Sequence, residues 1–140
     1  LHERLASVPA WRQWALHDRE PLNGANQMAQ GRVALLGDAA HPMRPYLAQG
    51  AGMAIEDAQA LALSLCAGGA SVPEQLYSYA QARWARNARV QARAIRNGRI
   101  FHAQGAVALG RNLSMRLMGE RLMDVPWLYG GGPSHVHSLG

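Results

Sequence analysis

Apolar positions along this chain follow two different spacings, which together predict a mixed α/β fold. Residues 33–36 form a short apolar run that ends at Gly37, which is typical of a buried parallel strand and predicts one over residues 32–36. Over residues 53–65 the apolar side chains recur at the helical period, and glycines at 68 and 69 are expected to end that helix. The pattern therefore predicts a strand followed by a helix.

The second half of the chain is dominated by helical periodicity. Ser71, followed three residues later by Glu74, is typical of a capping box at a helix start. This predicts a helix over residues 73–99, which the Asn97–Gly98 pair could interrupt. A further amphipathic helix is predicted over residues 109–123, and its expected apolar side carries Leu113, Leu117 and Met118.

The first thirty residues carry weaker patterns. A strand is expected around residues 13–17, and residues 21–30 are expected to form a connection with a turn at Asn23–Gly24. A single strand cannot form a stable sheet. The strand over 32–36 therefore needs partners that this chain does not obviously supply.

The chemistry of the chain is concentrated where the apolar run ends. Asp38 follows the run directly, and in open α/β sheets ligands lie beyond the carboxyl ends of the strands. A carboxylate there accepts hydrogen bonds from sugar or polyol hydroxyls. The small residues Gly37, Ala39 and Ala40 allow a bulky cofactor to approach the backbone, and a loop rich in proline and glycine follows over 42–52. This arrangement predicts a cofactor site.

Charge adds one alternative to this interpretation. The net charge is +5, and every basic residue is an arginine, most of them between Arg83 and Arg121. A basic helix can bind nucleic acid or an acidic membrane surface. Because these arginines are spread over several turns and interleaved with alanines, a solvated face or a face covering an acidic partner domain is favoured. On a helical wheel, one face carries Arg86, Arg89, Arg93 and Arg96, and Tyr79, Val90, Ala94 and Phe101 gather elsewhere.

Composition excludes several classes of protein. The chain has 140 residues with 49% hydrophobic but only 6% aromatic content, which fits one domain with a thin core. Cys66 is the single cysteine, so no intrachain disulfide can form, and we expect it to be a small buried residue. The sequence shows no metal-ligand spacing, signal peptide or apolar run near the roughly 20 residues that span a bilayer. These features favour a cytoplasmic location.

The string GRVALLGDAAHPMRPYLAQGAGMAIEDAQALALSL, residues 31–65, resembles the second flavin-binding motif of the class A flavoprotein monooxygenases, which are FAD-dependent aromatic hydroxylases. Residues 14–21, 79–83 and 127–130 resemble the salicylate hydroxylase-like branch of that family. The resemblance implies the C-terminal part of a Rossmann-like FAD-binding domain, with its last strand and helix, followed by a mostly α-helical segment.

The same resemblance implies an organisation of the chain in four parts. Residues 1–30 would be the end of a substrate domain with its connection, and residues 31–70 the second FAD-binding motif. C-terminal helices would follow over residues 71–129. The tail, residues 130–140, is expected to be disordered because it is polar and glycine-rich.

The resemblance also implies roles for individual residues. Asp38 would bind the ribityl chain of FAD, and Pro45 would lie against the flavin ring. Pro45 and Tyr46 would line the substrate pocket. Backbone N–H groups at the start of the helix would face the electron-rich pyrimidine edge of the flavin. The complete implied set of cofactor-binding residues is Gly37, Asp38, Pro45, Gln49, Gly50, Ala51, Gly52 and Met53.

Four polar residues near this motif admit more than one interpretation. His41 could contact a ligand, but hydrogen bonding to neighbouring backbone is favoured. Glu56 and Asp57 could be a catalytic pair, but adjacent helical residues point in different directions, so interaction with the helix dipole is favoured. Arg44 either attracts an acidic aromatic substrate or is simply exposed, and the sequence leaves both open.

The implied activity is hydroxylation of a small phenolic or heteroaromatic acid, such as a salicylate, hydroxybenzoate or hydroxynicotinate, with NAD(P)H and O₂ as co-substrates. No catalytic base is evident. The chain starts at Leu1 and lacks the GxGxxG fingerprint, so we expect it to be the C-terminal portion of a larger enzyme. Its expected partners are the absent N-terminal half and, as a homodimer, a second copy of the enzyme. The alternative is a non-catalytic helical module, derived from a flavoprotein, that serves binding or assembly.

Overall fold

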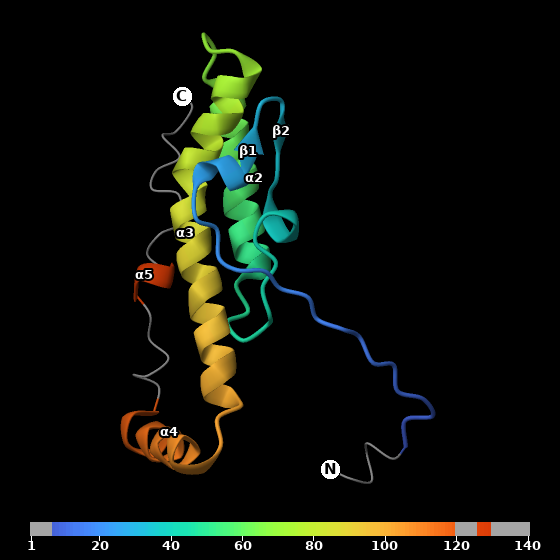
Figure 1. Cartoon of the computed structure of the whole chain (residues 1–140), viewed down its shortest axis with the longest axis vertical. Coiled ribbons are helices and arrows are strands. Elements are labelled where there is room, and N and C mark those ends of the chain that lie inside the picture. The colour runs from blue at the N-terminus through green and yellow to red at the C-terminus, as the bar shows by residue number, and fades with distance from the viewer. Residues whose placement is uncertain (1–6, 120–125, 130–140) are drawn as a thin grey trace, which may run out of the picture.

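The structure is a computed structural model that describes residues 7–119 and 126–129. Two long helices that lie side by side form the body of the molecule. Figure 1 shows a small hairpin against one end of this pair, a helix across the other end, and an N-terminal segment that extends away from the body. In chain order, the elements are η1 (Ala25–Gln27), β1 (Ala29–Gln30), β2 (Val33–Ala34), η2 (Gly37–Ala39), α2 (Gly50–Cys66), α3 (Val72–Phe101), α4 (Gly105–Met118) and α5 (Pro126–Tyr129).

The apolar run after Gly31 forms one arm of a hairpin instead of the expected buried parallel strand. Strand β2 pairs antiparallel with β1, with Ala29 opposite Ala34 and Gln30 opposite Val33. Gly31 has a φ of +57°, which lets the chain reverse within two residues. The side chain of Val33 is 65% exposed, so in this structure the run is not covered on both faces.

Two further expectations for the N-terminal region are corrected. No strand forms over residues 13–17; this segment is irregular, and Trp14 in it is 73% exposed. The segment 21–30, expected to be a connection, contains η1 and β1 and buries Leu22 and Met28 against α3. Short-range patterning missed these elements because their burial depends on a helix fifty residues away.

Helix α3 begins where the capping box predicts. The backbone N–H of Ser71 donates to the Glu74 carboxylate at 2.7 Å, and the helix continues unbroken through Asn97–Gly98. Gly98 is buried because the ring of Tyr46 occupies the space that a β-carbon would need, at 2.6 Å. Of the residues that the helical wheel places away from the arginine face, Tyr79, Val90 and Ala94 are buried, whereas Phe101 is 38% exposed.

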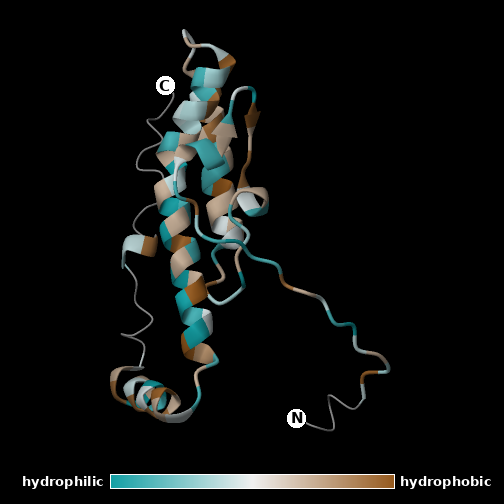
Figure 2. Ribbon diagram, in the orientation of Figure 1, coloured by the Kyte–Doolittle hydropathy of each residue, from teal (hydrophilic) through white to brown (hydrophobic). Residues whose placement is uncertain are grey.

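The core consists of two apolar clusters, both on the inner side of α3. One joins η1 and β1 to the first half of α3, and the other joins Met53, Val90 and Leu128. Figure 2 shows that hydrophobic colour is also present on α4, where Leu113, Leu117 and Met118 are exposed instead of packed.

Three smaller outcomes complete the fold. Helix α4 begins at Gly105, four residues earlier than predicted, and the predicted end at residue 123 lies outside the described residues, as does the tail 130–140. Cys66 is exposed, which corrects the expectation of burial, because it ends α2 just before the turn that leads to α3. Within the part of the chain that the structure describes, no helix is long and apolar enough to cross a membrane.

Candidate functional site

Gly37 fixes the loop after the hairpin directly onto helix α2. Its φ is +55°, and a β-carbon on it would lie 3.1 Å from the Cβ of Ala54. Its N–H also donates to Oδ2 of Asp57 at 3.1 Å. A side chain at position 37 would therefore strain the backbone and push the loop from the helix. This close contact sets the position of Asp38, the next residue.

Asp38 is exposed in η2 and lies beside the N-terminal end of α2. A β-carbon on Gly50 would be 3.8 Å from Oδ1 of Asp38, so the glycine leaves open space next to the carboxylate. Gly50, Ala51 and Gly52 are the first three residues of α2, and the N–H groups at such positions have no acceptor within a helix. An acceptor side chain and free backbone donors thus lie at one end of the helix.

Met53 departs from its expected role in this group. Its N–H donates to the carbonyl oxygen of Gln49 at 2.9 Å, and its side chain is buried in the core. The free backbone N–H groups at the helix start are therefore those of Gly50, Ala51 and Gly52, and the Met53 side chain packs in the core.

The loop over residues 42–49 carries Tyr46 against helix α3. The Tyr46 ring lies 6.1 Å from that of Phe101 and 5.5 Å, edge-on, from the ring of His102, measured between centroids. Tyr46 helps to line a cavity of about 490 Å³. Pro45 is exposed and is not among the described residues that line this cavity. The other lining residues are Asp18, Arg19, Glu20, Arg44, Ile95, Arg99 and His102.

Arg44 is both at this cavity and paired. Its Nε lies 2.6 Å from Oδ2 of Asp18. The hydrogen bond and the negative charge of Asp18 raise the pKa of Arg44. Arg44 therefore lines the cavity, but Asp18 already balances its positive charge.

A buried polar network beneath the loop was not predicted. Its centre is Asp57, which accepts hydrogen bonds from His41 Nε2 at 2.6 Å, Arg83 Nε at 2.9 Å and Asn87 Nδ2 at 2.9 Å, besides that from Gly37. Burial alone would raise the pKa of Asp57, but these donors outweigh it and lower the pKa to about 2. The network joins η2 and the residue His41 that follows it to α2 and α3.

Glu56 and Asp57 therefore both act differently from the favoured expectation. The helix begins at Gly50, so Glu56 and Asp57 lie beyond its first turn, where the helix dipole has little effect. The Glu56 carboxylate instead accepts hydrogen bonds from Nε and Nη2 of Arg86, at 2.7 and 2.9 Å. It also forms an ion pair with Arg83 at 2.7 Å. Burial opposes this ionisation, but the two arginines outweigh it and lower the pKa of Glu56.

His41 serves the structure, as favoured, but through a different partner. Its ring bonds the Asp57 carboxylate and not neighbouring backbone, and the residue is fully buried. Because an ionised carboxylate only accepts, Nε2 of His41 carries the hydrogen in this bond. The second ring nitrogen, Nδ1, is buried with no hydrogen-bond partner among the described residues.

One signal in the sequence could have revealed this network. Asp57 lies four residues after Met53 on the apolar face of its helix, and Arg83 and Asn87 continue the face that begins with Tyr79. Charged and amide side chains on the inward stripe of two neighbouring helices are expected to pair, because unpaired buried charges are costly.

A glycine-lined helix start thus lies next to an exposed acid, on a loop that is held by a buried network of ion pairs. Residues 6–94 match the FAD binding domain family, and the chain belongs to that family. The matched segment contains the hairpin, Asp38, the helix start and the Asp57 network, and ends within α3.

The chain is also similar to curated enzymes of known activity. It is 45% identical over 130 residues to the 3-hydroxybenzoate 6-hydroxylase of Polaromonas naphthalenivorans (strain CJ2), covering 91% of this chain and 32% of that protein. It is 46% identical over 127 residues to 3-hydroxybenzoate 6-hydroxylase 1 of Aquipseudomonas alcaligenes, covering 86% of this chain and 30% of the relative. The salicylate hydroxylase of Pseudomonas putida is 34% identical over 148 residues, with 91% and 33% covered. The chain thus spans about a third of the length of these relatives.

Proposed function

We propose that this chain supplies one half of the flavin site of an FAD-dependent monooxygenase that hydroxylates a small phenolic or heteroaromatic acid, with NAD(P)H and O₂ as co-substrates. The observation that carries the proposal is the juxtaposition of the exposed Asp38 carboxylate with the open, glycine-lined start of α2. The named activities of the similar proteins, all hydroxylations of aromatic acids, support the reaction class.

The residues at this helix start fit the chemical groups of FAD. Asp38 accepts hydrogen bonds from the hydroxyl groups of a ribityl chain. The free N–H groups of Gly50–Gly52 and the positive end of α2 favour the electron-rich edge of the flavin ring. Gly50 leaves the space next to Asp38 open, which a larger side chain would fill. The bound flavin supplies the redox and oxygen chemistry, and the protein binds and orients it.

The cavity beside Tyr46 fits the substrate side of this proposal. Its volume of about 490 Å³ suits a small aromatic molecule, and the Tyr46 ring forms part of its wall. Arg44 is balanced by Asp18, whereas Arg99 forms no ion pair with any described residue. We therefore assign Arg99 as the cation that attracts the carboxylate of an aromatic acid.

Flavin retention tests the proposal directly. The natural polypeptide that contains this sequence is expected to purify yellow, to be bleached by NAD(P)H and to recover in air. Asp38→Ala is expected to lower flavin occupancy at least tenfold, because it removes the carboxylate that accepts hydrogen bonds from the ribityl hydroxyl groups. Glu74→Gln, which removes the charge of an exposed acid at the start of α3 and keeps a side chain that can still cap that helix, is the matched control and is expected to retain the flavin.

Activity and cofactor binding fail in different ways. Consumption of NAD(P)H that rises only with hydroxybenzoates or related phenolic acids supports the reaction class, and Arg99→Gln is expected to raise KM more than it lowers kcat. A folded protein that remains colourless with added FAD would overturn the proposal in favour of a non-catalytic binding or assembly module.

A further inference from the structure

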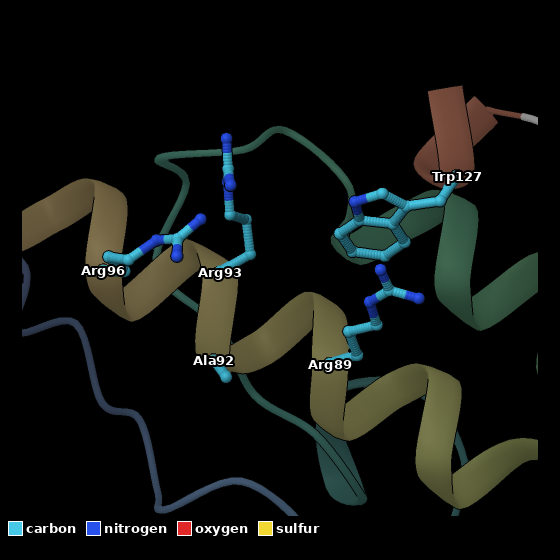
Figure 3. A pocket seen from close by; sticks show the side chains of 5 residues that line it. All are labelled: Arg89, Ala92, Arg93, Arg96 and Trp127. Carbon is cyan, nitrogen blue, oxygen red and sulfur yellow. The ribbon is translucent and has the colours of Figure 1, made fainter. Parts of the chain in front are cut away.

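One face of helix α3 carries a charged pocket that the flavin site does not use. The pocket has a volume of about 380 Å³ and is lined by Arg89, Ala92, Arg93, Arg96 and Trp127. The three arginines are spaced four and three residues apart, so they project from the same side of α3, as Figure 3 shows. No acidic residue is among the described residues that line it.

The wall of this pocket opposite the arginines is held in place by the core. Arg86 donates from Nη1 to the carbonyl oxygen of Trp127 at 3.2 Å and from Nη2 to that of Leu128 at 3.0 Å. Leu128 is buried against Met53 and Val90. These contacts hold helix α5 on α3, and they position the indole of Trp127 as one wall of the pocket.

The arginines of the pocket lack the partners that other arginines of α3 possess. Arg89 stacks on the Trp127 ring, with its guanidinium carbon 3.9 Å from the ring centroid. Neither Arg93 nor Arg96 forms an ion pair with a described residue, because Glu56 and Asp57 are already bound by Arg83 and Arg86. Moreover, Nε of Arg93 is buried without a hydrogen-bond partner within the described part of the chain.

A buried guanidinium nitrogen without an acceptor is unusual in proteins, and three cations within two helical turns repel one another. An anion in the pocket would resolve both conditions, since it supplies acceptors to Arg93 and Arg96 and neutralises the cluster. Guanidinium groups match the oxygens of a phosphate particularly well. The size of the pocket suits a small ligand and not a protein segment.

We propose that Arg89, Arg93, Arg96 and Trp127 form an anion site that binds the phosphate group of a small soluble ligand, separate from the flavin site. Arg93 and Arg96 bind the phosphate oxygens. Arg89, held on the Trp127 ring, adds charge at the rim.

Inorganic phosphate is the probe for this site. Phosphate is titrated by calorimetry into the flavin-loaded natural protein, with ionic strength held constant by sodium chloride so that general screening does not contribute. Saturable binding with one phosphate per chain is expected. The double variant Arg93→Gln/Arg96→Gln is expected to weaken this binding at least tenfold, without loss of flavin.

Arg32→Gln/Arg116→Gln is the matched control, because it removes the same two positive charges at exposed positions that do not line the pocket. Arg96→Lys, which keeps the charge but not the planar fork, tests the geometry in case the double variant fails to fold, and an intermediate loss of affinity is expected. Absence of saturable phosphate binding to the original protein would overturn the proposal. An equal loss in Arg32→Gln/Arg116→Gln would overturn it as well, since net charge alone would then explain the effect.

Discussion

Helix α3 carries arginines on both of its faces, and their environments differ: those on one face are paired with acids, and those on the other are not, within the part of the chain that the structure describes. On the inner face, Arg83 is buried and bonded to Asp57, Asn87 and Glu56. On the outer face, Arg93 and Arg96 line a pocket and have no ion-pair partner among the described residues. The comparison shows that arginines of one helix can have different roles. An arginine bound by acidic partners stabilises the structure, whereas one without such partners is available to bind a ligand.

The largest expected effect concerns the inner face. Asp57→Ala removes the acceptor shared by His41, Arg83 and Asn87, which leaves their buried donors without this partner and takes away one of the two carboxylates that bind Arg83. We expect the free energy of unfolding to fall by about 3–5 kcal/mol. Urea unfolding followed by circular dichroism measures it. A loss below about 1 kcal/mol would mean that water reaches the network, and the contrast between the faces would disappear.

Acid should weaken the inner face before it affects the outer face. The pKa of Asp57 is lowered to about 2 in the folded protein, below the ordinary value of 3.8. Its contribution is therefore complete above about pH 4 and is lost as the pH falls toward 2, amounting to about 2 kcal/mol. Urea unfolding at several pH values between 5 and 2 measures the slope. Asp57→Asn should flatten it, and an unchanged slope would assign the acid sensitivity to other carboxyl groups.

The start of α3 provides a calibration between the two faces, because its interaction is exposed. Ser71→Ala removes the cap that pairs with Glu74, and a loss of about 1 kcal/mol is expected. Thermal unfolding against the unchanged protein measures this value. If Ser71→Ala cost as much as Asp57→Ala, burial would not be the cause of the difference between the faces.

The smallest effect is expected on the outer face. Arg96→Gln removes an exposed cation that has no partner among the described residues, so the free energy of unfolding should change by less than about 0.5 kcal/mol. Urea unfolding in phosphate-free buffer measures this change. A large loss would show that Arg96 is bonded within the native protein, and the pocket would then be part of the structure.

Local signals predicted the helices well, and long-range contacts account for what was missed. The capping box at Ser71 located the start of α3, because the interaction spans only three residues. The apolar run before Gly37 did not reveal its partner, because a turn at Gly31 in the left-handed region produces a hairpin instead of a parallel neighbour. Periodicity places Asp57 and Arg83 on the inward faces of their helices, but it does not show that the two side chains meet, because they lie 26 residues apart on different helices.

The candidate site was predictable to a similar degree. A resemblance over residues 31–65 located Asp38 and the start of α2, and the structure brings the two together. Their assigned roles toward FAD stay predictions that the flavin measurements test. The pocket at Arg93 was only visible as a basic helical face, because its Trp127 wall comes from a segment more than thirty residues away.

Gly98 has a consequence for how this sequence can change over generations. A β-carbon at position 98 would lie 2.6 Å from the Tyr46 ring, and that ring belongs to the loop next to the proposed flavin site. Positions 46 and 98 are therefore expected to vary together across descendants of this sequence. A lineage that acquires alanine at 98 must first replace the tyrosine with a smaller residue, so the order of the two substitutions is constrained.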